Sequence, residues 1–355
     1  MEEITIKDIA RICGVGISTV SRAINNHPDI NQETKEKVME TIKKYHYIPN
    51  NSARNLKRQD AKVIAVLVKG IGNSFFSEMI RIMEEEIKRK KYSLVLQHVD
   101  YTEDEVDVAL ELVKEKRLRG IIFLGGYFRH NEEKLAQLHV PFVLSTIGVL
   151  PKEYSRNFYS SVSVDDEKES YKVVDYLCKS GHRDIAIICA RNTDASIGKL
   201  RLQGYEKALR DNGIPLREEL ILFMKSGIEE YSLENGYVVT KEFLKKNSQG
   251  SANGKKAVSC TAIYAISDIM AIGAQRALAE AGWKVPEDIS LVGFDGVKIG
   301  EYVTPSLTTL KQPMEEMALE TVSILFDVIE NQAEHQHKVF AGELVLRESA
   351  AARSV

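Results

Sequence analysis

Four polar side chains near the start of the chain are of the types that form contacts with DNA. Ser18, Thr19, Ser21 and Arg22 lie on the outward side of one short helical pattern. Small hydroxyls hydrogen-bond to phosphates or base edges, and an arginine makes a bidentate contact to guanine. A helical bundle with a merely solvated polar face is the alternative, because short helical motifs give false matches.

Three short helical patterns must position these side chains. The first ends at Gly14, a residue that tolerates positive φ, and a three-residue turn leads to the second. Asn31 is the expected N-cap of the third, with Glu33 in its first turn. Two helices joined by a tight glycine turn and braced by a third predict a helix-turn-helix. The apolar stripes comprise Ile6, Ile9, Ala10 and Cys13, then Ile17, Val20 and Ile24, then Val38, Ile42 and Tyr45.

A short basic segment follows the third pattern. Pro49 ends the helix, and residues 50–57 suffice for about two helical turns, too few to be stable alone in water. Leu56 has no evident core partner, whereas Arg54 and Lys57 suit phosphates. The segment is either a plain linker or a hinge that folds on DNA and inserts Leu56 between base pairs in the minor groove.

The stretch 5–58 resembles the DNA-binding headpiece of the lactose-repressor (LacI/GalR) family. The resemblance rests on TIKDIA, STVSRAIN, TKEKV, YIPN and ARNL, in that order. It implies that Ile17, Ser18 and Arg22 read bases and that Leu56 intercalates. Gly16 departs from the family, which usually has Ser or Thr at this N-cap. The expected DNA contacts are Thr5, Ile17, Ser18, Thr19, Ser21, Arg22, Asn50, Ala53, Arg54, Leu56 and Lys57.

From residue 62 the sequence alternates between strand and helix patterns. Residues 62–68 form a continuous apolar run typical of a buried parallel strand. The alternation predicts two doubly wound α/β halves that face each other across a cleft, with ligand-binding loops after the strands. The polar segment 245–260 is expected to be a surface insertion, with a second nucleic-acid contact as the alternative. The expected strands are 62–68, 93–96, 120–124, 141–144, 184–188, 220–224, 262–266 and 289–294, and the expected helices are 75–90, 103–116, 131–138, 167–179, 198–212, 231–245 and 268–281.

This body also resembles the family, whose effector domain has the periplasmic-sugar-binding-protein fold. NSFFSE, GHRDIA, RLQGY, SDIMAIGA and LVGFDG carry the resemblance. It implies that both subdomains are discontinuous in sequence. The expected organisation is a headpiece over 1–48, a hinge over 49–60 and an effector domain over 61–355, with an N-subdomain at about 61–161 and 293–325 and a C-subdomain at about 162–292 and 326–355.

The resemblance further implies an effector site at the strand ends. Phe75, Phe76, Arg201, Tyr231 and Asp268 match ligand-contacting positions of the family. Core packing is an equal alternative for Phe76, and Asp268 is also placed to cap its helix. An arginine, an aspartate and aromatic faces suit the hydroxyls and apolar face of a sugar, and the same set could hold a purine. Ser145, Asp166, Asp194 and Phe294 are further candidates, placed by loop position.

The remaining motifs favour a binding protein over an enzyme. The sequence has no GxGxxG after its first strand, no P-loop, no GxSxG and no HExxH, and its eight histidines are dispersed. The four cysteines lack CxxC spacing, so we expect reduced packing residues and neither a metal nor a cofactor. No 18-residue apolar run and no signal peptide are present, which favours a cytoplasmic protein over a secreted sugar-binding protein.

Charge bears on how such a protein would hold DNA. The net charge is −3, yet residues 1–60 hold 10 Lys and Arg against 8 Asp and Glu. Affinity must then depend on local placement and on dimerisation rather than on a general field. The family resemblance implies a homodimeric repressor of carbohydrate-utilisation genes that binds a near-palindromic operator and responds to a small effector. A purine-responsive, co-repressed regulator is the alternative, and the C-terminus lacks the heptads of a tetramerising coiled coil.

Overall fold

The computed structural model describes residues 4–24, 27–45, 62–126, 132–148, 158–190, 197–248 and 259–353. Its contacts divide the chain into two units, Met1–Ala61 and Lys62–Val355. Each unit is described by itself. The expected hinge at 49–60 lies outside the described residues. No described helix is both long enough and apolar enough to cross a membrane.

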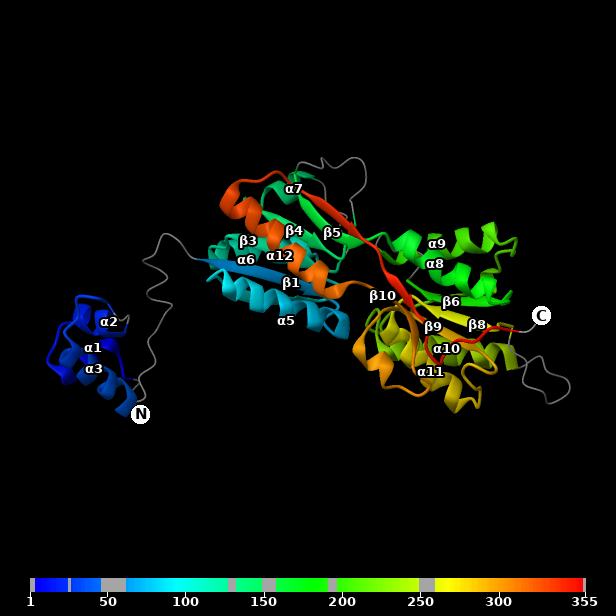
Figure 1. The fold of residues 1–355 in the computed structure, drawn as a ribbon, viewed down its shortest axis with the longest axis horizontal. Helices are drawn as coiled ribbons and strands as arrows, with labels where there is room; N and C mark the ends of the chain where they lie inside the picture. Colours follow the sequence, from blue (N-terminus) through cyan, green and yellow to red (C-terminus); the bar gives the residue numbers. More distant parts are fainter. Residues whose placement is uncertain are drawn as a thin grey trace. The chain divides into compact units, whose positions relative to one another are not determined.

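The described part of the first unit consists of three helices, α1 (Ile6–Cys13), α2 (Ile17–Ile24) and α3 (Gln32–Lys44) (Figure 1). Gly14 ends α1 at φ 66°, and the Asn31 side chain caps α3 by accepting hydrogen bonds from two backbone amides, as predicted. Ile17 and Tyr45 are 45% and 39% exposed, so their assignment to the apolar stripes was wrong. Ile17 is the first residue of α2 and is exposed, whereas Val20 and Ala23 of the same helix are buried in the core. The core comprises Ile9, Ala10, Cys13, Val20, Ala23 and Val38.

The second unit contains two parallel sheets flanked by helices, as the strand–helix alternation predicts (Figure 1). Among the described residues each sheet has six strands, in the orders β11-β5-β4-β3-β1-β2 and β12-β10-β9-β8-β6-β7. Only the β10–β12 pair among these is antiparallel. The first sheet comprises β1 (Val63–Lys69), β2 (Ser93–Val99), β3 (Gly120–Leu124), β4 (Phe142–Ser145), β5 (Ser160–Val164) and β11 (His337–Phe340). The second comprises β6 (Ile185–Cys189), β7 (Ile221–Phe223), β8 (Ala262–Ala265), β9 (Ser290–Asp295), β10 (Thr308–Lys311) and β12 (Glu343–Val345).

The central strand β1 shows why an unbroken apolar run is needed here. Successive side chains of a strand point to opposite faces, and both faces of this sheet are covered. Ile64, Val66 and Val68 pack in the same core as α5, whereas Ala65 and Leu67 pack with α6. The helices are α5 (Ser74–Arg89), α6 (Glu105–Lys116), α7 (Glu132–Ala136), α8 (Asp166–Lys179), α9 (Ile197–Asp211), α10 (Leu233–Ser248), α11 (Asp268–Glu280) and α12 (Met314–Asn331), with short 3-10 turns at Glu218–Leu220 and Lys298–Glu301.

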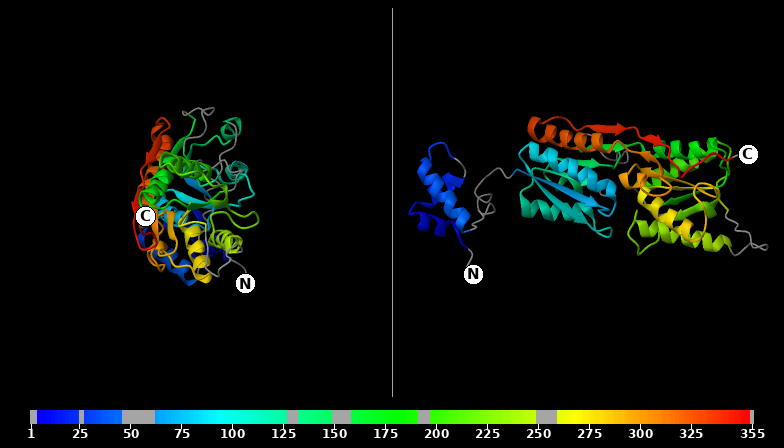
Figure 2. Two further views of the ribbon diagram at one scale, coloured as in Figure 1. Left: turned by 90° about the vertical axis from the view of Figure 1, so that its right-hand side faces the viewer. Right: turned by 60° about the horizontal axis from the view of Figure 1, so that its bottom comes forward.

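The chain crosses between the two sheets at different points from those expected. The chain was expected to re-enter the first subdomain at about residue 293, which was wrong. Strands β9 and β10 both lie in the second sheet, where Thr308 pairs with Val292. The chain returns only with α12, which packs on α5, β4 and β5. It then adds β11 to the first sheet, not the second, before β12 completes the second. We call the part built on the first sheet the first lobe and the part built on the second sheet the second lobe. Figure 2 shows the orange and red C-terminal segments running along both lobes.

Strand β5 was missed because it is rich in serine. Its sequence, SSVSV, is buried at every position. The hydroxyls of Ser160 and Ser161 hydrogen-bond to His335 and His337, which lie in or next to β11. Buried polar groups are tolerated when they are hydrogen-bonded, and here the partners come from some 175 residues later in the chain. Local sequence therefore gave no strand signal.

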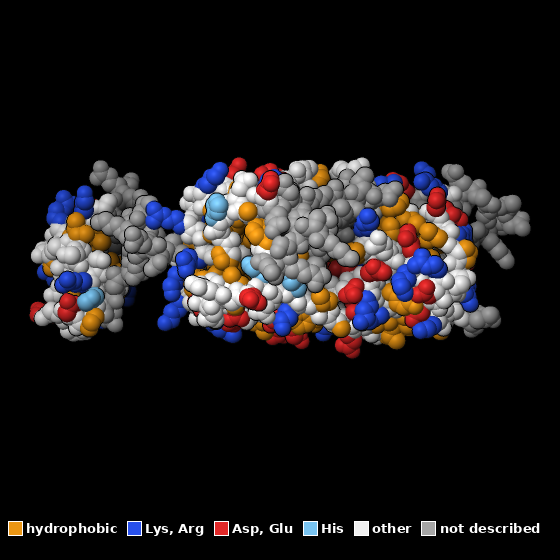
Figure 3. Space-filling model, turned by 90° about the horizontal axis from the view of Figure 1, so that it is seen from above, with side chains coloured by type: hydrophobic (Ala, Val, Ile, Leu, Met, Phe, Trp, Pro, Cys, Tyr) orange, Lys and Arg blue, Asp and Glu red, His pale blue; other side chains and the backbone are white. Residues whose placement is uncertain are grey.

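Two surface features complete the second unit. Helix α10 continues to Ser248, so the first residues of the expected insertion at 245–260 are helical, and 249–258 lie outside the described residues. On the face shown in Figure 3, basic side chains of this unit are interspersed with acidic ones. On this face, such a mixed surface offers DNA little general attraction.

Candidate functional site

The outward face of α2 gathers the side chains expected to contact DNA. Val20 and Ala23 are buried against the other two helices, which turns Ile17, Ser18 and Arg22 to the surface. Thr19 and Ser21 are half-buried on the same helix. Thr5 is exposed but engaged at the start of α1, where its hydroxyl donates to Asp8 at 2.6 Å. Asn50, Ala53, Arg54, Leu56 and Lys57 lie outside the described residues.

A cavity of about 450 Å³ opens at the carboxyl ends of the strands in the second unit. Its wall draws on both sheets, with residues that end or follow β1, β2, β3, β4, β9 and β10. This is where a ligand binds in an open α/β sheet. Of the expected effector residues, Phe75, Phe76, Arg201 and Tyr231 line it. The sequence had not singled out the other polar wall residues, which include Lys69, Asn73, His98, Asp100, Tyr101, Thr146, Glu229, Glu230, Asp295 and Gln312.

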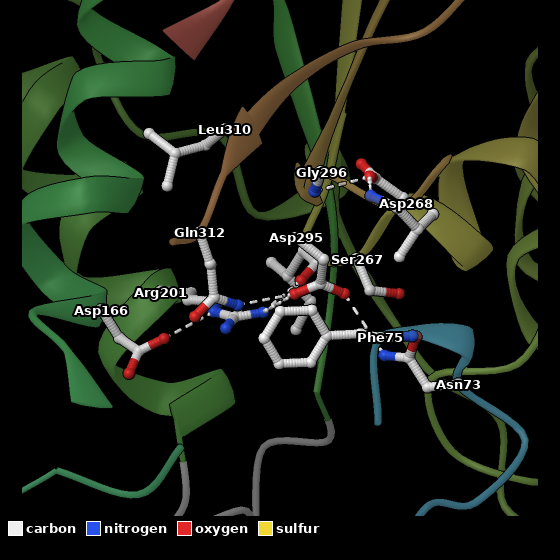
Figure 4. Close-up of polar contacts among 12 residues, drawn as sticks. Asn73, Phe75, Asp166, Arg201, Ser267, Asp268, Asp295, Gly296, Leu310 and Gln312 are labelled. Atoms are coloured by element: carbon white, nitrogen blue, oxygen red, sulfur yellow. Dashed lines mark hydrogen bonds and ion pairs between the residues drawn. The ribbon is translucent and has the colours of Figure 1, made fainter. Parts of the chain in front are cut away.

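Arg201 is the centre of the polar network (Figure 4). It comes from α9, is 3% exposed, and donates from Nε to Asp166 at 2.8 Å and from Nη1 to the Ile266 carbonyl at 2.5 Å. Its guanidinium carbon lies 3.7 Å from the centre of the Phe294 ring. Burial acts to lower the pKa of Arg201, but Asp166 and Asp295 raise it overall, so the guanidinium stays charged. Asp166 and Phe294 thus hold Arg201 from behind and do not line the cavity.

Asp295 is the carboxylate that the cavity presents to Arg201. It ends β9 with φ 123°, and its Oδ1 lies 3.8 Å from Arg201 Nη1. Asn73 donates to its Oδ2 at 3.3 Å and Gln312 to its Oδ1 at 2.8 Å. Burial raises the pKa of Asp295 to about 7, against the opposing charge of Arg201. The sequence had pointed to the preceding residue, Phe294, although an acid directly after a buried strand was the available signal.

Asp268 does not line the cavity, which contradicts the expectation that it contacts the effector. It is fully buried and accepts hydrogen bonds from the amides of Gly296 and Val297, both at 2.8 Å, and from the Thr309 hydroxyl at 2.5 Å. Burial raises its pKa to about 6. The N-cap of α11 is Ser267, so the expected capping role of Asp268 was also wrong. Its carboxylate instead fixes the loop that follows β9.

The aromatic candidates serve the wall and the core together. Phe75 and Phe76 open α5, are 1% and 9% exposed, and meet edge to face at 5.7 Å. Phe76 therefore packs in the core and also lines the cavity. Tyr231 lies before α10 at φ 53°, so the expected helix start at 231 was early. Asp194 lies outside the described residues.

Thr146 is a wall residue whose buried hydroxyl has no hydrogen-bond partner among the described residues. It directly follows β4 at φ 69°, a conformation that a β-branched residue rarely adopts without a compensating reason. It is 7% exposed, and its hydroxyl has no hydrogen-bond partner among the described residues. Its neighbour Ser145, an expected effector contact, points elsewhere and shares a hydrogen bond of 2.9 Å with Thr321 behind the wall. A buried hydroxyl without a partner is costly. A polar ligand in the cavity could form the hydrogen bond that the Thr146 hydroxyl lacks.

The cations of the described wall are both engaged by carboxylates. Lys69 lies 3.1 Å from Glu105 and donates to the Glu103 carbonyl at 2.7 Å, while Arg201 is held by Asp166. The wall also carries four acids, and burial raises the pKa of two of them, Asp295 and Glu230. The acids are Asp100, Glu229, Glu230 and Asp295.

Nothing in the described residues groups three or more His, Cys, Asp or Glu side chains as a metal would require. The four cysteines are buried and form no disulfide with one another. Burial raises the pKa of Cys178 to about 11 and that of Cys260 to about 12, so these thiols stay protonated and unreactive at neutral pH.

Comparison with known proteins covers both units. Residues 5–50 match the family of bacterial regulatory proteins described as lacI, and residues 174–350 match a periplasmic binding protein-like domain. The HTH-type transcriptional regulator MalR of Clostridium butyricum is 44% identical over 346 residues, 97% of this chain and 98% of that protein. The complex of the transcriptional regulator CelR with cellobiose aligns with a TM-score of 0.67 and 26% identity, covering 98% of this chain and 99% of that one. The lac repressor dimer bound to operator and the anti-inducer ONPF shares the fold, with a TM-score of 0.73 and 24% identity over 99% of this chain and 100% of that one.

Proposed function

Since this chain belongs to the LacI family of bacterial transcriptional regulators, we propose that it is a repressor whose affinity for operator DNA is set by an uncharged sugar bound in the cavity. The observation that carries the ligand half of this proposal is Thr146, a strained and buried wall residue with an unsatisfied hydroxyl. A hydroxylated ligand would supply the missing partner. The protein then acts by binding alone and catalyses no reaction, in keeping with its regulatory relatives.

The DNA half of the proposal rests on α2. Ile17, Ser18 and Arg22 are exposed on one short helix, with a residue pattern that suits base edges and phosphates. Two copies would present two such helices to successive major grooves, about one helical turn apart. The dimeric state of the operator-bound lac repressor, which has the same fold, supports this arrangement. The place of action is then the cytoplasm.

The polar groups of the cavity suit vicinal hydroxyls. Arg201 and Asp295 lie side by side at its wall, a donor next to an acceptor, and Gln312 extends the pair. Planar charged groups of this kind form paired hydrogen bonds with neighbouring hydroxyls of a sugar ring. The aromatic faces of Phe75, Phe76 and Tyr231 could cover the apolar side of the ring. That CelR binds cellobiose on a similar fold supports a carbohydrate.

The balance of charge favours an uncharged ligand over a sugar phosphate. A phosphate needs cations or backbone amides that are not already neutralised. Within the described wall Lys69 and Arg201 are each paired with a buried carboxylate, and further acids line the cavity. A phosphate ester would therefore meet net repulsion.

A single side chain offers a route from the cavity to the rest of the unit. Asn73 caps α5 of the first lobe through its oxygen, which accepts from the Phe75 amide at 3.0 Å, and donates through its nitrogen to Asp295 of the second lobe. A sugar that bonds to Asp295 would compete with Asn73. The relative position of the lobes would then depend on the ligand, which is the kind of two-state element that couples distant sites.

The test is a pair of neighbouring substitutions. Thr146→Val keeps the β-branch and the backbone strain but removes the unpaired hydroxyl. We expect unchanged or higher thermal stability together with a loss of sugar affinity by about tenfold, the effect of one hydrogen bond. Ser145→Ala removes the adjacent hydroxyl that bonds to Thr321, so it should lower stability and leave affinity unchanged.

Both variants and the parent would be titrated calorimetrically with neutral disaccharides, including cellobiose, with their phosphate esters and with purine bases. Binding of a neutral sugar that Thr146→Val weakens supports the proposal. Preferential binding of a phosphate ester would refute the charge argument. Binding of a purine alone would replace the sugar with the alternative effector class.

A further inference from the structure

The turn between α2 and α3 places an acid beside the outward face of α2. Asp29 Oδ2 lies 3.6 Å from Arg22 Nη1, and its other oxygen contacts Nδ1 of His27. The Arg22 and Asp29 side chains are 56% and 55% exposed, so this pair lies at the surface. The hydrogen bond with His27 and the charge of Arg22 hold the pKa of Asp29 below its ordinary value. The carboxylate is therefore ionised at neutral pH.

Neither stability nor general attraction to DNA accounts for this acid. An exposed ion pair contributes little to folding, because water screens the charges and both side chains lose freedom. A carboxylate next to a surface that meets DNA also repels the phosphates, which dominate non-specific affinity. Asp29 would therefore weaken non-specific binding, yet it lies in contact with Arg22.

We propose that Asp29 is a positioning residue for base recognition, which holds one edge of the Arg22 guanidinium and leaves the Nε–Nη2 edge for a bidentate contact with guanine. The inference rests on the proposed function, since it requires α2 to enter the major groove. Guanidinium donors lie in one rigid plane, so a charge contact at Nη1 also favours one direction for the others. Guanine presents two acceptors, O6 and N7, to that groove. Arg22 lies one helical turn after Ser18, on the face of α2 that is exposed.

Two effects of opposite sign follow from this role. Without Asp29, Arg22 samples more orientations, so its preference for guanine over other bases falls. The same change removes a negative charge from the DNA-facing surface, so binding to DNA of any sequence strengthens. A residue that only supported the headpiece fold would lower both quantities together.

The experiment uses the full-length protein and a pool of duplexes randomised across two half-sites about one helical turn apart. Selected pools for the parent, Asp29→Ala, Asp29→Asn and Arg22→Ala would be sequenced to give the base preference at each position. Glu40→Gln is the matched control, because it removes one exposed negative charge from α3. Affinity for an unselected duplex at several salt concentrations would measure the electrostatic, sequence-independent part of DNA binding.

We expect Asp29→Ala to reduce the guanine preference at one position of each half-site by about 3- to 10-fold, less than the 5- to 150-fold of losing a whole bidentate contact. Arg22→Ala should lose preference at the same position, and a variant that combines Arg22→Ala with Asp29→Ala should lose no more. Asp29→Asn, which keeps the shape and an acceptor, should lie between Asp29→Ala and the parent. Asp29→Ala and Glu40→Gln should both strengthen binding to the unselected duplex.

Unchanged base preference in Asp29→Ala would overturn the proposal, as would an equal loss of affinity for every sequence. Loss at a position that Arg22→Ala leaves intact would also overturn it. A parent protein that selects no sequence at all would instead refute base reading by α2, and this inference would fall with it.

Discussion

Replacing Asp295 with Asn should change how the stability of the second unit depends on pH. Burial raises the pKa of Asp295 from 3.8 to about 7. A carboxyl group whose pKa is raised by folding adds stability below its unfolded pKa, and that stability is lost as pH rises through the folded pKa. The parent should therefore lose stability from this group between about pH 4 and 7, whereas Asn cannot ionise.

The size of the effect follows from the shift. About three pKa units correspond to about 4 kcal/mol in all, of which about 2.5 kcal/mol falls between pH 5 and 8. Asn keeps only one acceptor oxygen for the two amides that Asn73 and Gln312 donate, which costs about 1–3 kcal/mol at every pH. The variant should thus be less stable than the parent at pH 5. Its free energy of unfolding relative to that of the parent should rise by about 2–3 kcal/mol between pH 5 and pH 8.

Urea unfolding of both proteins at pH 5, 6, 7 and 8 would measure this difference, followed by the fluorescence of the single tryptophan, Trp283. Trp283 packs against the main core of the second unit, so its signal reports that unit. Comparing variant with parent cancels the titrating groups that do not interact with Asp295, whereas the charge of Asp268 contributes to the raised pKa of Asp295. A free-energy difference that does not change with pH, or that moves against the variant as pH rises, would refute the assignment of a raised pKa to Asp295.

Three further outcomes are expected. Sugar affinity of the parent should rise about tenfold from pH 6 to pH 8, because ionised Asp295 accepts stronger hydrogen bonds than its protonated form, and calorimetry should find no such rise in Asp295→Asn. Gly293→Ala should lower the free energy of unfolding by about 1–3 kcal/mol in urea, since its Cβ would overlap the Asp268 carboxylate, and an unchanged midpoint would disprove that close approach. Gly14→Ala should destabilise the first unit by about 1 kcal/mol in a thermal melt followed by circular dichroism, because φ is 66° there and the space is otherwise open; a variant as stable as the parent would contradict the left-handed cap.

The elements whose signals are local could be predicted from the sequence. The end of α1 at Gly14 and the start of α3 at Asn31 follow from caps formed within three residues, and the structure has both. The alternation of strands and helices over 62–294 follows from apolar periodicity and gave the fold class. Each of these signals is complete within a few neighbouring residues.

Partners distant in sequence decided the remaining elements. Strand β5 forms from a serine-rich segment because His335 and His337 satisfy its hydroxyls. Strand β10 stays in the second sheet because it pairs with β9, although the family pattern suggested an earlier return to the first. Apolar periodicity cannot report which sheet a strand joins, since both sheets bury similar side chains.

The candidate site divides along the same line. The family resemblance of the sequence assigned Phe75, Phe76 and Arg201 to the effector site, and the cavity includes them. Only the tertiary structure decided between two acids: Asp268 is captured by two backbone amides and a threonine 41 residues away, while Asp295 faces Arg201. The contacts of a buried carboxylate are set by the hydrogen-bond donors around it. Those donors come from segments that meet only in the folded chain.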